Sequence, residues 1–475
     1  MSALGRLIKQ GRASHRAVAF FAVASLIGFP AGALRVLCLG NACQVRAKAS
    51  SDTPFCSLPD EVRRLIESGS YEGRSPDIMA VTGSTLIAGG DTFRRDASAP
   101  LWPSTTLPDG ERVPVVFAGR GVVQRASVPS GTGLDDVSET IAAIIDLRRP
   151  HPDVRSGESV DGLASGEIPR LVLEVVWKGV GSDGLERHPE EWPQLKQLMR
   201  DGAATMDAVV GSLPLDPAAT LATIGTGGLP SRHGITGTLL RTDQTSYDLT
   251  IAEEKAGGEV VRAWTKRAPD SVIATLGDHL DEKRHQKPVV GLVGTDPIDR
   301  GLIGGSWYPD GDRDSVAILD RSASVEEQIG AARALLSRED FGRDEITDLA
   351  GVVLSGRVTK LDSALSRLIR TAKDVSGGSV AISVTATGES EPGGSATVAD
   401  ARVVRGRIER AIRTSEPAIE AVVPGGLYLD QQALDRLKLS DDVVLRELLR
   451  IRSRSGDQLI ADAFPAIAIT FGRYC

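Results

Sequence analysis

Residues 171–185 read LVLEVVWKGVGSDGL, an apolar, β-branched run that ends in a glycine-bearing turn. Such a run predicts a strand that is buried on both faces of a parallel sheet. Lys178 stands at the junction between this strand and the turn. A protonated lysine offers N–H donors and a positive charge but no lone pair, so it repels a metal ion and cannot ligate one.

The same pattern recurs along the chain after residue 169. Further apolar runs at 287–294, 349–355 and 379–386 alternate with amphipathic segments such as SVEEQIGAARALLSRE and KLDSALSRLIRTAKD. Buried strands interleaved with helices predict a three-layer α/β/α fold with a mostly parallel central sheet. We expect residues 166–475 to form its main core.

The preceding segment has a similar texture. It offers strands at 76–82 and 112–119 and a helix at 134–147, followed by a polar, glycine-bearing linker at 150–169. We therefore expect residues 50–165 to belong to the same compact domain.

Composition narrows the class of protein. The chain has 475 residues and a formal charge of −8, without a long basic block, which argues against a nucleic-acid partner. Basic residues at 6–16 precede an uncharged stretch from Ala17 to Leu34. This pattern predicts that residues 1–49 are an export signal or membrane anchor, with a buried N-terminal helix as the alternative. The predicted location is extracytoplasmic, either secreted or membrane-anchored.

Residues 192–237 carry a family motif. They contain Thr226-Gly227, Pro230 and His233-Gly234-Ile235 after an amphipathic helix. This segment resembles the alkaline phosphatase superfamily, especially its type I phosphodiesterase/nucleotide pyrophosphatase branch. RVPVVFAG at 112–119 resembles the end of the same fold but comes first in this chain, so the resemblance implies a circularly permuted order of elements.

Members of this superfamily hydrolyse phosphate or sulfate esters with two metal ions, usually zinc, and the family motifs can be compared with this chain. Lys178 replaces the aspartate of the first strand, and the nucleophile position falls at Asp216 or Pro217, where Asp-Pro is a good helix start. Thr220 is the nearest hydroxyl, and Thr385 and Thr387 replace a Ser-Asp-His-Gly motif. None of the chain's six histidines has a convincing site spacing.

These departures predict that the usual metal centre is absent. The resemblance places Lys178 opposite Asp216 in a degenerate cleft with Thr385 and Thr387, and implies a salt bridge between the first two; a solvated lysine is the alternative. Permutation also implies a disulfide between Cys56 and Cys475 across the old connection, with unpaired thiols as the alternative.

The sequence therefore predicts an exported pseudoenzyme without a cofactor that binds an envelope protein or an anionic ligand. The N-terminal segment would hold it at the membrane if it is not cleaved. The alternative is a phosphodiesterase or other phosphoester hydrolase with a non-standard, zinc-dependent site. A third possibility is a structural envelope protein whose cleft is packed shut.

Overall fold

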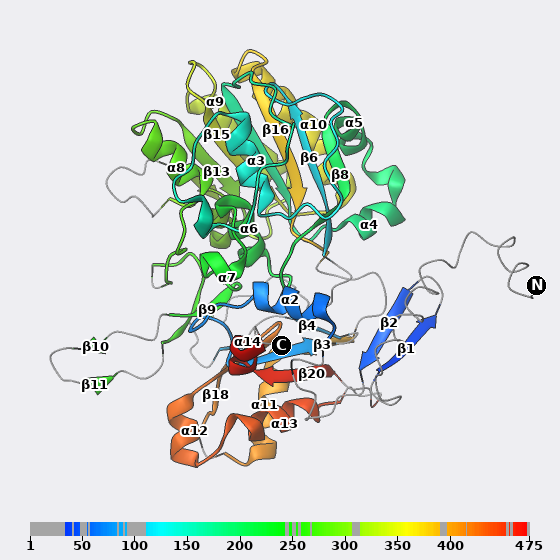
Figure 1. Ribbon diagram of the computed structural model, residues 1–475, viewed down its shortest axis with the longest axis vertical. Coiled ribbons are helices and arrows are strands. Elements are labelled where there is room, and N and C mark those ends of the chain that lie inside the picture. Colours follow the sequence, from blue (N-terminus) through cyan, green and yellow to red (C-terminus); the bar gives the residue numbers. More distant parts are fainter. Residues whose placement is uncertain are drawn as a thin grey trace, which may run out of the picture.

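The computed structural model describes residues 55, 58–82, 111–242, 258–266, 268–305, 314–389, 397–414, 416–452, 456 and 459–472 (Figure 1). It also describes short strands at 34–39, 42–47, 85–88, 91–92, 247–248 and 253–254. Cys475, Cys56 and residues 1–33 lie outside these ranges, so the predicted disulfide and export segment stay predictions. Within the described ranges, every helix is too short or too polar to cross a membrane.

The largest sheet that the structure describes has seven strands in the order β14-β13-β15-β7-β16-β6-β8, and we call it the main sheet. Its strands are β14 (Ser315–Ile318), β13 (Val290–Gly294), β15 (Asp348–Leu354), β7 (Leu171–Trp177), β16 (Val380–Ala386), β6 (Arg112–Gly119) and β8 (Ala203–Val209). All of them run parallel except β6, which is antiparallel to both of its neighbours. Every residue of β7, β15 and β16 is buried, as their continuous apolar runs predict.

Helices cover both faces of this sheet (Figure 1). One face carries α5 (Pro193–Asp201), α9 (Val325–Arg338) and α10 (Val358–Val375); the other carries α3 (Asp136–Ile144), α6 (Pro217–Thr226), α8 (Leu276–Lys283) and the 3-10 helix η8 (Pro297–Leu302). Gly291 faces Phe341 and Leu335 on the first side, and Gly351 faces Leu302 and Ile303 on the second. The expected three-layer α/β/α fold with a mostly parallel sheet is confirmed.

A second sheet, which the sequence did not reveal, has the order β20-β3-β19-β18-β5. Its strands are β20 (Ile460–Pro465), β3 (Ile78–Thr82), β19 (Gly426–Leu429), β18 (Ile419–Val423) and β5 (Asp91–Thr92), and all their pairings are antiparallel. The expected strand at 76–82 thus exists but lies here, outside the main sheet. Pro424-Gly425, with Gly425 at φ 94°, forms the hairpin turn between β18 and β19.

Helices also cover the second sheet. They are α2 (Asp60–Ser68), α11 (Ala401–Ile412), α12 (Gln431–Leu437), α13 (Asp441–Leu449) and α14 (Ala466–Gly472). The remaining elements are short: β1 (Leu34–Leu39), β2 (Ala42–Ala47), β4 (Thr85–Ala88), η6 (Pro152–Val154), α4 (Ser182–Arg187), η7 (Pro189–Glu191), α7 (Pro230–His233), β9 (Leu239–Arg241), β10 (Tyr247–Asp248), β11 (Glu253–Glu254), β12 (Val260–Arg262) and β17 (Thr397–Asp400).

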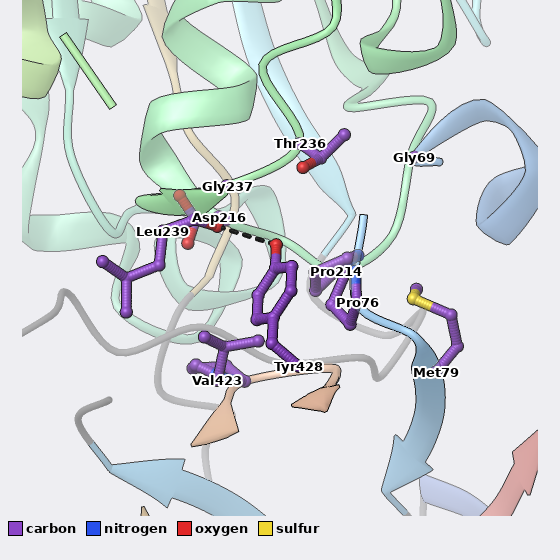
Figure 2. Close-up of a pocket in the computed structure, with 11 residues that line it drawn as sticks. Gly69, Pro76, Met79, Pro214, Asp216, Thr236, Gly237, Leu239, Val423 and Tyr428 are labelled. Carbon is purple, nitrogen blue, oxygen red and sulfur yellow. Dashed lines mark hydrogen bonds between the residues drawn. The ribbon is translucent and has the colours of Figure 1, made fainter. Parts of the chain in front are cut away.

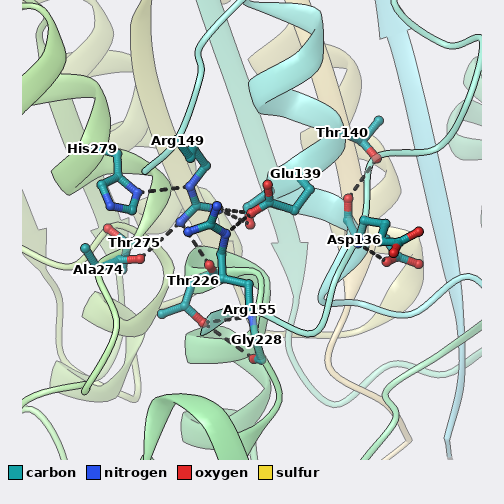
Figure 3. A network of polar contacts seen from close by, with 12 residues as sticks. Asp136, Glu139, Thr140, Arg149, Arg155, Thr226, Gly228, Ala274, Thr275 and His279 are labelled. Carbon is teal, nitrogen blue, oxygen red and sulfur yellow. Dashed lines mark hydrogen bonds and ion pairs between the residues drawn. The ribbon is translucent and has the colours of Figure 1, made fainter. Parts of the chain in front are cut away.

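A buried arginine joins the N-terminal segment to the main core. Arg149, whose side chain is 1% exposed, pairs with Glu139 of α3 at 2.5 Å (Figure 3). Its other N–H groups reach the carbonyls of Thr226 at 2.9 Å and Ala274 at 3.0 Å, and Nδ1 of His279 at 3.0 Å. Burial, and then the positive charge of Arg149, lower the pKa of His279 to about 3, so this imidazole is neutral.

A second buried arginine joins β9, which pairs with β12 in a two-stranded sheet, to the second sheet. Arg241, which ends β9, donates to both carboxylate oxygens of Asp77 at 2.9 and 2.8 Å. It also donates to the carbonyl of Leu429 in β19 at 3.0 Å. The hydroxyl of Tyr428 completes the junction by donating to the carbonyls of Arg74 at 3.0 Å and Leu239 at 3.2 Å. Side chains of β9 and of the second sheet therefore satisfy polar groups on each other's side of this boundary.

Candidate functional site at the strand ends

The candidate site lies at the carboxyl edge of the main sheet. Parallel strands place their carboxyl ends at one edge, which is where open α/β sheets bind ligands. Lys178 follows β7 there, Thr387 follows β16, and the segment from Thr295 to Asp299 follows β13. Each of these positions follows a buried strand, and the strand fixes the backbone from which the side chain projects.

A fully buried ion pair is the central feature of this site. The Nζ atom of Lys178 lies 2.6 Å from Oδ1 of Asp299, and both side chains are 0% exposed. The other oxygen of Asp299 accepts the backbone N–H groups of Thr295 at 2.8 Å and Asp296 at 3.1 Å. Gly294 permits this approach, because a Cβ atom there would lie 2.5 Å from Oδ2 of Asp299.

Burial acts on both members of the pair. It lowers the pKa of Lys178 and raises the pKa of Asp299, because a low-dielectric environment disfavours each charged form. Their mutual attraction opposes both shifts. The charges are therefore retained only as a pair, and loss of either partner leaves the other unstable in its charged state.

Two arginines neutralise the second acid of the site. Asp296, 0% exposed in its side chain, accepts from Nη2 of Arg262 at 2.6 Å through each oxygen, and Arg321 contacts the same carboxylate. Burial alone would raise the pKa of Asp296, but the hydrogen bond and charge of Arg262, followed by the charge of Arg321, lower it overall. Among the described residues, each of these two buried carboxylates is thus held by at least one cation.

Asp216 begins α6, as the Asp-Pro pair in the sequence predicted. Its Oδ1 atom accepts the N–H of Ala218 at 2.8 Å and the hydroxyl of Thr238 at 2.9 Å. It is the N-cap of α6, followed by Pro217 in the first turn. The expected salt bridge with Lys178 is corrected accordingly: the ion pair that the structure shows for Lys178 is with Asp299.

In the described part of the chain, the nucleophile region that the resemblance implies is buried. The hydroxyl of Thr220 donates to the carbonyl of Asp216 at 3.1 Å and is 1% exposed as a residue. A cavity beside Asp216, lined also by Thr236 and Tyr428, has a volume of about 10 Å³ (Figure 2). That is about the room that one water molecule needs. Burial raises the pKa of Asp216, although hydrogen bonds from Thr238 and Ala218 oppose the shift.

Two threonines at the end of β16 lie close to β7: Thr385 within the strand and Thr387 just after it. Thr387 accepts the backbone N–H of Gly179 at 2.9 Å, which holds the turn after Lys178. Thr385 is completely buried, and its hydroxyl has no hydrogen-bond partner. In register on the same pair of strands, Glu174 faces Ser383, and each leaves a buried oxygen without a partner. These residues supply hydroxyls and one carboxyl, a poor set for a dimetal centre.

Histidines do not contribute to this edge in the described residues. His233 is buried, with Nε2 3.1 Å from the hydroxyl of Thr223 and Nδ1 accepting the N–H of Ile235 at 3.0 Å. Burial lowers the pKa of His233 to about 3, so its imidazole is neutral and stabilises the turn through these two hydrogen bonds. Among the residues that the structure describes, one group has metal-ligand proximity: His188, Glu190 and Glu191 in an exposed turn around η7. Exposed groups of this kind are common without a metal.

Four charged residues of the site were not predicted from the sequence, namely Asp296, Asp299, Arg262 and Arg321. A signal for the acids was present, because GTDPIDRG at 294–301 places Asp-Pro directly after a buried strand with a second aspartate at the capping-box position. The two arginines come from β12 and from the loop before α9. Nothing in their local sequence announces a contact across the fold.

One segment of the chain matches a known protein family. Residues 172–357, which span β7 to the start of α10, match the family model described as type I phosphodiesterase / nucleotide pyrophosphatase. Through this segment the chain is similar to the type I phosphodiesterase / nucleotide pyrophosphatase family.

Solved structures give weaker likenesses. A multiply substituted mutant of alkaline phosphatase PafA is 14% identical with a TM-score of 0.42, and the wild-type enzyme is 13% identical with a TM-score of 0.41. Each comparison covers 59% of this chain and 76% of the other. No curated protein matches the chain. The circular permutation stays a prediction.

Proposed function

We propose that this protein is a non-hydrolytic relative of the alkaline phosphatase superfamily that acts as a binding or scaffolding protein of the cell envelope. The observation that carries the proposal is the Lys178–Asp299 pair, with 2.6 Å between its charged atoms and no exposed side-chain surface. An ammonium group stands at the end of the first parallel strand, where the family resemblance implies a metal-binding carboxylate.

The chemistry of the donors supports this proposal. A dimetal hydrolase needs several lone-pair donors that converge on an open position. Here the carboxylate of Asp299 is occupied by Lys178 and two backbone N–H groups, and that of Asp296 by two arginines. The residues present therefore do not fit a zinc pair, and we derive no hydrolytic step through one.

Metal content and turnover test the proposal together. Zinc and manganese are measured on the purified full-length protein, and bis-p-nitrophenyl phosphate serves as the probe substrate. We expect less than one metal ion per protein molecule. We also expect no turnover that the change Asp299→Asn abolishes. Asp299→Asn is compared with Asp320→Asn, a matched change at a fully exposed carboxylate.

The competing hydrolase function makes the opposite prediction. Stoichiometric metal, together with turnover that Asp299→Asn or Asp216→Ala abolishes and Asp320→Asn retains, would establish a non-standard metal site. The proposal would then be wrong. Equal, metal-free inactivity of all these variants supports it.

The envelope location is proposed from the sequence, because a basic flank precedes an apolar stretch at residues 17–34. Cell fractionation and N-terminal sequencing of the native protein test it. We expect membrane or extracytoplasmic fractions, and a non-reducing peptide map that links Cys56 to Cys475. A protein found wholly in the cytosol with both thiols free would contradict this part of the proposal.

A further inference from the structure

The short hairpin formed by β1 and β2 carries two cysteines at facing positions. The strands are antiparallel, and their register pairs Cys38 with Cys43. Leu39 pairs with Ala42, and only residues 40–41 lie between these two in the sequence. In a hairpin with a two-residue connection, the pair beside the connection exchanges hydrogen bonds and the next pair outward does not. Cys38 and Cys43 therefore occupy a non-hydrogen-bonded pair of the ladder.

This position brings the backbones of the two cysteines within the span of a disulfide. The Cα atoms of a non-hydrogen-bonded antiparallel pair are about 4.5 Å apart. Disulfides join residues whose Cα atoms are about 4.4–6.8 Å apart. A bond between Cys38 and Cys43 therefore needs no change in the path of either strand.

The residues that share a face of the hairpin with the two cysteines are apolar. Successive residues of a strand alternate between its faces, so one face of the hairpin takes positions 34, 36, 38, 43, 45 and 47. These positions hold Leu34, Val36, Cys38, Cys43, Val45 and Ala47. A structural zinc ion needs about four ligands, drawn from cysteine, histidine and acidic residues. The six positions offer two, so this face suits a disulfide better than a metal site.

The hairpin also benefits from a covalent link. β1 and β2 have six residues each and form a two-stranded sheet, which is marginally stable in water by itself. Arg35 and Arg46 are paired directly across the other face, where like charges are destabilising. β2 lies against β20, at the edge of the second sheet. A crosslink would hold the two strands in register against the repulsion of the arginines.

We propose that Cys38 and Cys43 form a disulfide that closes the β1–β2 hairpin. One cysteine thiolate attacks a disulfide of the oxidised-glutathione class, forms a mixed disulfide and releases one glutathione thiol. The second thiolate then attacks the protein sulfur of the mixed disulfide and releases the other glutathione thiol. One S–S bond breaks in the oxidant as one forms in the protein, and the two thiol protons pass to the released glutathione molecules.

This disulfide is separate from the expected pairing of Cys56 with Cys475 and from the chemistry at the strand ends. Its formation in the cell rests on the proposed extracytoplasmic location, because disulfides persist in oxidising compartments. Both hairpin cysteines follow the apolar stretch at residues 17–34, so a protein anchored by that stretch retains them.

Peptide mapping of the purified full-length protein tests the pairing. The protein is equilibrated in a buffer of reduced and oxidised glutathione, its free thiols are blocked with N-ethylmaleimide, and it is digested with trypsin. Cleavage after Arg35 and Arg46 releases both cysteines in one peptide, VLCLGNACQVR. A disulfide leaves this peptide unalkylated and without its two thiol hydrogens. The readout depends neither on the location of the protein nor on any hydrolytic activity.

A variant with a shifted cysteine distinguishes the hairpin register from mere proximity in the chain. Cys43→Ser combined with Gln44→Cys moves one thiol to the other face of the hairpin and keeps both thiols in the same tryptic peptide. We expect the equilibrium ratio of disulfide to dithiol to be at least about tenfold higher in the wild type than in this variant.

Three results would overturn the inference. Equal crosslinking of the wild type and the variant would show that closeness in the sequence, and not the register, joins the cysteines. Alkylation of both cysteines in the wild type, or a crosslink from this peptide to Cys56 or Cys475, would exclude the pair directly. A native protein whose N-terminus lies beyond Cys43 would exclude it as well, because the mature chain would then lack both cysteines.

Discussion

A single residue, Lys178, shows what sequence can and cannot say about a buried charge. Its position after β7 was predictable from the apolar run before it, and so was its inability to bind metal. Its partner was not, because Asp216 and Asp299 both lie beside the same sheet edge, and only their local roles distinguish them. Asp216 caps a helix, whereas Asp299 turns one oxygen to the backbone and the other to the lysine.

The ion pair predicts a clear pattern of stability. Lys178→Met leaves the Asp299 carboxylate buried without its cation, and we expect a loss of about 3–5 kcal/mol in the free energy of unfolding. Asp299→Asn leaves the ammonium unpaired and is expected to be similarly harmful. The double variant should be less destabilised than the sum of the two, because neither charge remains. Urea unfolding of the three variants measures this coupling, and strict additivity would show that the charges do not interact.

Glu174 predicts a pH dependence of stability. Burial raises its pKa to about 8, from 4.5. The unfolded chain releases this proton near pH 4.5 and the folded chain near pH 8, so the folded state loses stability as the pH rises between these values. Glu174→Gln should therefore be neutral at pH 4 and stabilising by about 3–5 kcal/mol above pH 8.

The measurement is thermal or urea unfolding of both proteins from pH 4 to pH 9. Glu282→Gln, at an exposed position of α8, is the matched control and should show no such trend. A pH-independent difference between Glu174→Gln and the wild type would mean that Glu174 is solvated or charged in the folded protein.

The secondary-structure elements were predicted from the sequence more accurately than the residues of the site. The expected strands at 112–119, 287–294, 349–355 and 379–386 are all present in the main sheet, because continuous burial leaves a strong apolar signal. The second sheet escaped notice because its strands are short and come from distant parts of the chain. IEAVVPGGLYL at 419–429 did contain a Pro-Gly hairpin signal between two apolar runs.

The start of α6 predicts the effect of losing its cap. Asp216→Ala removes the acceptor for Ala218 N–H and leaves the buried hydroxyl of Thr238 without one of its partners. We expect a loss of about 2–3 kcal/mol in stability, measured by urea unfolding. Asp216→Asn keeps an oxygen in place and should be much milder. If both changes were equally harmful, the charge of Asp216 would matter more than its capping role.

At the scale of the whole molecule, two buried arginines connect segments that are far apart in the sequence. The sequence predicted these segments one by one, but it did not predict the contacts between them. Arg149 links α3 to α6 and to the segment before α8, and Arg241 links β9 to the second sheet. Both contacts join residues far apart in the chain, so a local pattern could not reveal them. They explain how the N-terminal segment and the C-terminal strands complete one packed structure.

Arg149 predicts how strongly the N-terminal segment depends on this connection. Arg149→Met removes donors from Glu139, His279 and two backbone carbonyls, and we expect a loss of about 3 kcal/mol or more. Hydrogen exchange should quicken in α3 and at the carboxyl end of α6. Arg148→Met, a neighbouring exposed position, should leave both stability and exchange unchanged. Protection of α3 that survives Arg149→Met would show that apolar packing alone holds the segment.

The placement of β6 has a consequence for how the chain is made. This strand emerges early from the ribosome, yet its two sheet neighbours are β8 and β16, and β16 begins only at Val380. During synthesis, β6 can therefore form its hydrogen bonds with β16 only after most of the polypeptide has been made. A ribosome-bound fragment that ends before Val380 therefore lacks one hydrogen-bonding partner of β6, and the main sheet can be completed only after β16 has been made.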